Sequence, residues 1–141
     1  MLSTRPLLAA VALSTLSALT LTAQAVTPAA AQTLPSGVVV THLTAGSGAQ
    51  PTASSVVKVH YEGKLKDGTV FDSSYKRGSP AVFPLNRVIP CWTEGVQTLK
   101  VGGKASLQCP AKTAYGASGA GGVIPPNADL TFTVELLAIE R

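Results

Sequence analysis

Residues 57–66 alternate between apolar side chains and charged or polar ones. Val57, Val59 and Tyr61 fall on one face of this stretch, and lysine, histidine and glutamate side chains fall on the other. A period of two is typical of an antiparallel strand with one buried and one solvated face. Asp67-Gly68 follows directly, and residues 69–74 form a second run of strand type, so the sequence predicts a β-hairpin here.

The remaining segments complete a mostly β domain with one helix. Further strands are predicted at 38–43, 82–85, 104–109 and 130–136. A helix is predicted to begin at Pro90, to carry Trp92, Val96 and Leu99 on one face, and to end before Gly102-Gly103. A helix this short is marginal in water and needs packing partners. We therefore expect an α+β fold, a five- to six-stranded antiparallel sheet curled around one short helix.

The N-terminus is predicted to direct export. Arg5 precedes an apolar stretch, and Ala23-Gln24-Ala25 fits the small-x-small cleavage pattern, so residues 1–25 indicate a signal peptide. Cleavage after residue 31 is the alternative. Residues 26–36 are expected to be a flexible lead-in and residues 37–141 the folded domain. The mature chain is then expected in the periplasm or outside the cell, without membrane attachment.

Two cysteines, Cys91 and Cys109, lie in the predicted mature chain. An oxidising compartment favours a disulfide between them. Two buried free thiols are the main alternative, and metal ligation is a weaker one, because His42 and His60 do not converge on the cysteines by any known spacing.

Composition excludes several functional classes. The net charge is +4, but the basic residues are scattered, which argues against nucleic-acid binding. There are only two histidines and no glycine-rich phosphate loop, so neither a nucleophilic enzyme, a metal nor a cofactor is predicted. The few aromatic residues fall near strand ends, the helix start or loops. As a set they could line one apolar pocket with few polar groups.

Five motifs occur in order along the chain: 59–63 (VHYEG), 67–74 (DGTVFDSS), 88–95 (VIPCWTEG), 114–116 (AYG) and 124–126 (IPP). Together they resemble the FKBP-type peptidyl-prolyl cis-trans isomerases, in particular small exported bacterial members. The resemblance covers roughly residues 38–140. It implies an isomerase that accelerates rotation about X–Pro bonds in folding exported proteins, by stabilising a twisted imide in an apolar aromatic pocket.

The resemblance also implies roles for individual residues. Asp72 and Tyr115, with Phe71 beside them, are the expected catalytic residues. Trp92 is expected under the proline ring, and Arg77 is expected to pair near Asp72. The expected substrate-binding residues are Tyr61, Phe71, Arg77, Phe83, Val88, Ile89, Trp92, Tyr115, Val123, Ile124 and Phe132.

Departures from the family pattern refine these expectations. Ala81 and Ala120 stand where an aromatic residue and a histidine are common, so weaker binding of macrolides such as tacrolimus or rapamycin is expected. Cys91 and Cys109 replace a glycine and an aliphatic residue, which favours the disulfide. A monomer that binds proline-containing segments of unfolded proteins is predicted. A non-catalytic binding module on the same fold and a general exported chaperone are the competing hypotheses.

Overall fold

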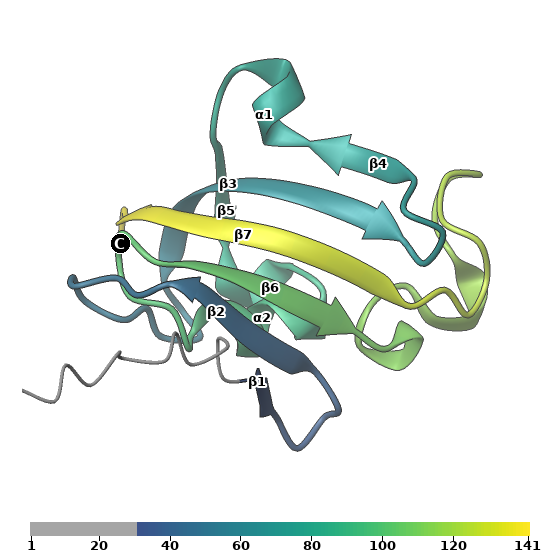
Figure 1. Cartoon of the computed structure of the whole chain (residues 1–141), viewed down its shortest axis with the longest axis horizontal. Coiled ribbons are helices and arrows are strands. Elements are labelled where there is room, and N and C mark those ends of the chain that lie inside the picture. Colours follow the sequence, from purple (N-terminus) through teal and green to yellow (C-terminus); the bar gives the residue numbers. More distant parts are fainter. Residues whose placement is uncertain (1–30) are drawn as a thin grey trace, which may run out of the picture.

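One antiparallel sheet forms most of the molecule (Figure 1). The computed structural model describes residues 31–141, so the predicted signal peptide and residues 26–30 lie outside the described part. The strands are β1 (Ala31–Thr33), β2 (Val39–Thr44), β3 (Val56–Leu65), β4 (Val70–Ser73), β5 (Ala81–Pro84), β6 (Lys104–Cys109) and β7 (Leu130–Ile139). Their order is β1-β2-β6-β7-β3-β4, and β5 also pairs with β3.

The helix α2 (Pro90–Val96) packs against this sheet, which confirms the predicted α+β class. The described part has seven strands rather than five or six, and it also has a single-turn helix, α1 (Ser74–Arg77). Short 3₁₀ turns are η1 (Leu85–Arg87), η2 (Ala111–Thr113) and η3 (Gly116–Ser118).

The helix ends earlier than the sequence predicted. It stops at Val96, and hydrogen bonds from the N–H groups of Thr98 and Leu99 to the third residue back replace the α-helical pattern. The side chain of Thr98 also donates to the Gly95 carbonyl, 2.7 Å away, which satisfies a terminal carbonyl of the helix. Leu99 is nevertheless buried, so the apolar stripe that begins at Trp92 still faces the core.

The alternation in β3 is confirmed by burial. Val57, Val59 and Tyr61 are buried and the residues between them are half-buried. The predicted hairpin to β4 is also present, because the Leu65 N–H donates to the Thr69 carbonyl at 2.8 Å. Gly68, at φ 90°, adopts a backbone conformation that side chains disfavour.

One edge of β3 is shared by two short strands. β5 pairs with its first part, up to Val59, and β4 pairs with its last part, from Glu62 onward. The buried Ser74 hydroxyl fills the gap, since it accepts the Tyr61 N–H at 2.7 Å and donates to the Tyr61 carbonyl at 3.2 Å. A side chain thus completes the ladder where no strand passes, and it fixes the backbone of Tyr61.

Residues 31–36 are the described part of the expected flexible lead-in, and the structure shows them attached to the domain. Residues 31–33 form strand β1, which pairs with β2 through the register Ala31 to Thr41. The Ser36 hydroxyl then hydrogen-bonds to the Glu94 carboxylate on α2. Backbone pairing and this side-chain contact hold residues 31–36 against the domain, although the composition of residues 26–36, rich in Ala, Thr, Pro and Gln, indicated a flexible segment.

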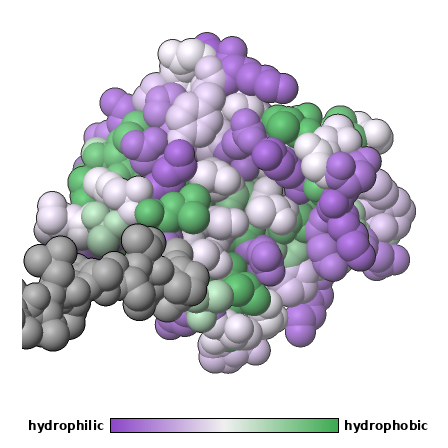
Figure 2. Space-filling model, in the orientation of Figure 1, coloured by the Kyte–Doolittle hydropathy of each residue, from purple (hydrophilic) through white to green (hydrophobic). Residues whose placement is uncertain are grey.

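The surface is mixed in character. Figure 2 shows hydrophilic side chains spread between small hydrophobic areas on the face drawn. Among the described residues, no helix has the length and apolar character that crossing a bilayer requires.

Candidate functional site

An aromatic cavity of about 370 Å³ lies between α2 and the sheet. Its walls come from β3, β4, β5, η1, α2, β7 and the loop that contains Tyr115. The lining residues are Tyr61, Phe71, Asp72, Phe83, Arg87, Val88, Ile89, Trp92, Tyr115 and Phe132. Segments far apart in the chain therefore converge on one hollow, most of whose lining side chains are apolar.

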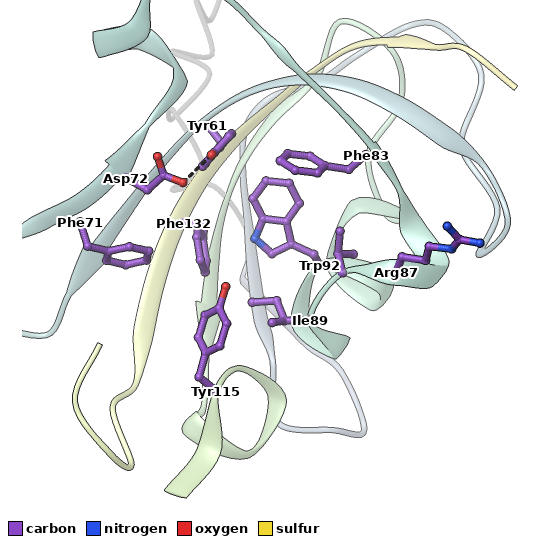
Figure 3. A pocket seen from close by; sticks show the side chains of 10 residues that line it. Tyr61, Phe71, Asp72, Phe83, Arg87, Ile89, Trp92, Tyr115 and Phe132 are labelled. Atoms are coloured by element: carbon purple, nitrogen blue, oxygen red, sulfur yellow. Dashed lines mark hydrogen bonds between the residues drawn. The ribbon is translucent and has the colours of Figure 1, made fainter. Parts of the chain in front are cut away.

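The Trp92 indole lies at the centre of this lining (Figure 3). Three rings meet it edge to face, with centroid distances of 5.2 Å to Tyr61, 5.4 Å to Phe83 and 5.4 Å to Phe132. Such T-shaped pairs are favourable because the positive edge of one ring meets the negative face of another. The indole N–H has no conventional acceptor among the described residues and faces the perpendicular Phe132 ring.

Two glycines make room for this arrangement. A Cβ atom on Gly63 in β3 would lie 2.5 Å from Phe71 and 2.8 Å from Phe132. A Cβ on Gly95 would lie 2.8 Å from Leu107, so glycine lets α2 approach β6 closely. Both positions carry glycine for space rather than for a special backbone angle.

The polar side of the cavity is built around Asp72. Its carboxylate accepts a hydrogen bond from the Tyr61 hydroxyl at 2.5 Å and forms an ion pair with Arg77. Partial burial disfavours the charged carboxylate, but the hydrogen bonds from Tyr61 and Arg77 outweigh it and lower the pKa of Asp72. Burial and the neighbouring carboxylate raise the pKa of Tyr61. At neutral pH the pair is therefore a carboxylate held by a neutral phenol and a guanidinium.

Two hydrogen-bond donors at the cavity are unused by the described residues. The Tyr115 side chain extends toward the space beside Phe132 and Ile89, and its hydroxyl has no partner in the described part. The Ile89 carbonyl accepts from Trp92 and Thr93 at the start of α2, whereas the Ile89 N–H makes no backbone hydrogen bond. The site thus offers two free donors next to an apolar hollow.

A disulfide braces the helix directly behind the indole. Cys91 and Cys109 are bonded and buried, and their Cα atoms are 5.6 Å apart. This confirms the pairing predicted from export and removes the free-thiol and metal alternatives. The bond links the first turn of α2 to the end of β6, next to Trp92.

Three predicted site residues do not line the cavity. Arg77 lies behind Asp72 and reaches it through the ion pair. Ile124 is only 7% exposed and belongs to the core, whereas Val123 is 54% exposed on the loop before it. The remaining predicted residues are brought together, and their roles toward a substrate stay predictions.

Two residues of the site were missed by sequence reasoning. Gly63 gives no chemical signal, and only the packing of Phe71 on Phe132 reveals why it is glycine. Arg87 lines the cavity from η1, immediately before the Val88-Ile89 pair. Its adjacency to that pair was the available signal. In residues 31–141 no group of three potential metal ligands comes together.

Known proteins are similar to this chain in sequence and in fold. Residues 47–137 match the FKBP_C family, described as FKBP-type peptidyl-prolyl cis-trans isomerase. The chain is 62% identical over 96 residues to an Aeromonas hydrophila protein named FKBP-type peptidyl-prolyl cis-trans isomerase FkpA. This alignment covers 68% of this chain and 35% of the relative. It is 55% identical over 94 residues to the Escherichia coli FKBP-type 22 kDa peptidyl-prolyl cis-trans isomerase, covering 67% of this chain and 46% of the relative.

Solved structures give the same result. A peptidyl-prolyl cis-trans isomerase from Pseudomonas syringae pv. tomato superposes with a TM-score of 0.74 at 40% identity, covering 79% of this chain and 81% of that chain. Escherichia coli FkpA superposes with a TM-score of 0.75 at 47% identity, covering 77% of this chain and 51% of that chain. The chain spans less than half the length of the two sequence relatives named above.

Proposed function

Because this chain belongs to the FKBP-type peptidyl-prolyl cis-trans isomerases, we propose that it accelerates rotation about X–Pro bonds in folding proteins. The observation that carries the proposal is the Trp92 indole, edge-on to three rings in the lining of a cavity with a single carboxylate. This hollow suits a proline ring and offers little to a charged or strongly polar ligand.

The chemistry requires a change of shape rather than a reactive group. Amide resonance gives the X–Pro bond a rotation barrier of about 18–20 kcal/mol, and that resonance is lost when the bond twists. A twisted amide has less charge separation than a planar one, so a water-poor pocket favours it over the planar ground state. Binding the twisted form more tightly than either planar isomer lowers the barrier.

Individual residues are assigned by their position around the cavity. Trp92 supports the proline ring from below. The free hydroxyl of Tyr115 and the free N–H of Ile89 donate to substrate carbonyls and hold the peptide on either side of the twisting bond. Asp72, fixed by Tyr61, lies near the imide with Phe71 beside it and does not need to exchange a proton.

The remaining substrate contacts are assigned to the cavity wall and the neighbouring loop. Phe83, Val88 and Phe132 complete the apolar wall. Val123 and Ile124 contact the substrate from the loop that follows Tyr115, through a movement that brings them nearer the cavity.

The proposed cellular location rests on the predicted signal peptide. Residues 1–25 act as a signal peptide, residues 37–141 form the isomerase domain, and the mature monomer works in the periplasm or outside the cell on exported chains. The buried disulfide supports an oxidising compartment. Macrolides such as tacrolimus or rapamycin occupy the same cavity more weakly than is usual, because Ala81 leaves one wall thin.

A proline-limited refolding assay tests the proposal. Added protein at micromolar concentration is expected to accelerate the slow phase, and an excess of macrolide is expected to reduce the acceleration. Binding of a prolyl peptide without any acceleration would instead support a non-catalytic binding module. Suppression of aggregation that persists in Trp92→Ala would indicate a chaperone function independent of the cavity.

A further inference from the structure

Arg87 connects the aromatic cavity to a second hollow. It lines the aromatic cavity from η1, and it also lines a neighbouring cavity of about 450 Å³. The other residues around that second cavity are Ser54, Val56, Pro84, Asn86 and Arg141. In Figure 3 the Arg87 guanidinium points away from the aromatic rings.

The charge of Arg87 is uncompensated. All seven acidic residues of the chain lie in the described part, and the ion pairs there join Glu62 to Lys64 and Asp72 to Arg77. Neither Arg87 nor Arg141 pairs with any of the seven. Arg87 therefore lines both cavities and has no ion-pair partner among the described residues.

The two ends of the site differ in sign. At the Asp72 end, Arg77 neutralises the only carboxylate of the aromatic cavity. At the Arg87 end, positive charge is left unpaired. A peptide that places its proline ring over Trp92 and continues past Val88 and Ile89 meets this unpaired charge.

We propose that Arg87 binds the carboxylate of a glutamate or aspartate adjacent to the substrate proline, so that the chain favours an acidic over a basic residue at that position. This specificity rests on the proposed isomerase function. The planar guanidinium fork matches a carboxylate in two parallel hydrogen bonds. Because Arg87 is exposed, the preference is modest and weakens as salt rises.

Peptides with one variable position test the proposal. Glutamate, glutamine or lysine is placed immediately before or immediately after proline in an otherwise neutral peptide, and kcat/KM is measured at low and high salt. In one of the two positions we expect glutamate to exceed lysine by about two- to fivefold at low salt, an effect of the size found for exposed charge pairs. At 1 M salt the ratio is expected to approach one.

Variants locate the effect. Arg87→Glu is expected to invert the glutamate-to-lysine ratio, and Arg87→Gln to bring it near one. Lys100→Glu is the matched control, because Lys100 is exposed and lines neither cavity, yet its substitution changes the net charge equally. The control is expected to keep the wild-type ratio.

The outcomes separate this inference from the proposed function. If the glutamine peptide is isomerised but the ratio in the wild-type protein is one, or if Lys100→Glu changes the ratio as much as Arg87→Glu does, the acidic preference is wrong and the isomerase assignment stands. If no peptide is isomerised, the proposed function itself fails. Should Arg87→Glu fold poorly, an unchanged ratio in Arg87→Gln would equally overturn the inference.

Discussion

The base of the aromatic cavity and its rim are built on different principles. The base consists of Trp92, its neighbouring rings and the disulfide behind it, all of which are also part of the protein core. The rim consists of half-exposed groups such as Asp72, Tyr115 and Arg87, which contribute little to the core. Substitutions in the base should therefore disturb folding and activity together, whereas substitutions in the rim should disturb activity alone.

The largest effect is expected at Trp92. Trp92→Ala removes a 96% buried side chain and three ring contacts, so we expect a loss of about 3–5 kcal/mol in the free energy of unfolding. Acceleration of refolding should fall close to the uncatalysed rate. Denaturant unfolding and the refolding assay measure the two effects. Trp92→Phe serves as the milder variant, and full stability with lost activity in Trp92→Ala would contradict the shared role.

Removing the disulfide tests whether the base of the cavity can lose stability while it keeps its shape. Cys91 and Cys109 are 18 residues apart, and replacing both by alanine is expected to cost about 3 kcal/mol in the chain-entropy model. Activity measured well below the unfolding midpoint should remain within about threefold of the wild-type value, because no disulfide atom lines the cavity. Thiol titration of the denatured, unreduced wild-type protein provides the control and should find no free thiol.

Asp72 is the corresponding test of the rim. Asp72→Ala should lower kcat/KM by about tenfold or more, an effect of the size expected for a polar group close to the reacting bond. The free energy of unfolding should change by less than about 1 kcal/mol, since exposed ion pairs contribute little. Unfolding of this variant comparable to that of Trp92→Ala would break the distinction between base and rim.

The pH dependence of activity tests the role of the Asp72 carboxylate. Its pKa is lowered in the folded protein, so its stabilising contribution is present above the unfolded value of about 4 and is lost as pH falls through the folded value. We expect activity to be flat from about pH 5 to 9 and to fall in more acidic solution as the carboxylate protonates. Asp72→Asn should lack this acid limb. An acid limb of unchanged shape in Asp72→Asn would assign the titration to another group.

The smallest effect is expected on the loop after Tyr115. Val123 is exposed and lies outside the cavity lining. Val123→Ser should leave the free energy of unfolding within about 0.5 kcal/mol. We expect kcat/KM to fall by about two- to threefold, because the proposed movement of the loop brings Val123 to the substrate. An unchanged kcat/KM would remove Val123 from the substrate-binding residues.

Sequence reasoning succeeded where a local pattern determines the structure. The alternation in β3, the Asp67-Gly68 hairpin and the helix start at Pro90 each depend on near neighbours, and each is present. Most of the cavity lining was also anticipated, because motifs carry those residues as sets. The pairing of Cys91 with Cys109 followed from the compartment expected for an exported chain.

What was missed depends on contacts between distant segments. The β1 strand forms because β2 offers an edge to pair with, although its own residues have no strand pattern. The Ser74 hydroxyl that completes the edge of β3, and the glycine required at position 63, both respond to atoms supplied by other strands. Arg87 was overlooked because its proposed role depends on a second cavity that only the folded chain creates.

The division of one β3 edge between two short strands also limits unwanted association. The outermost strands β1, β4 and β5 have three, four and four residues. The Ser74 hydroxyl bonds to β3 between β5 and β4, so these two strands do not form one continuous ladder. Long open edges recruit other extended chains and nucleate aggregates. A protein that meets unfolded chains as its proposed substrates thus presents them with a pocket, while the sheet formed by residues 31–141 offers no extended template on which they could assemble.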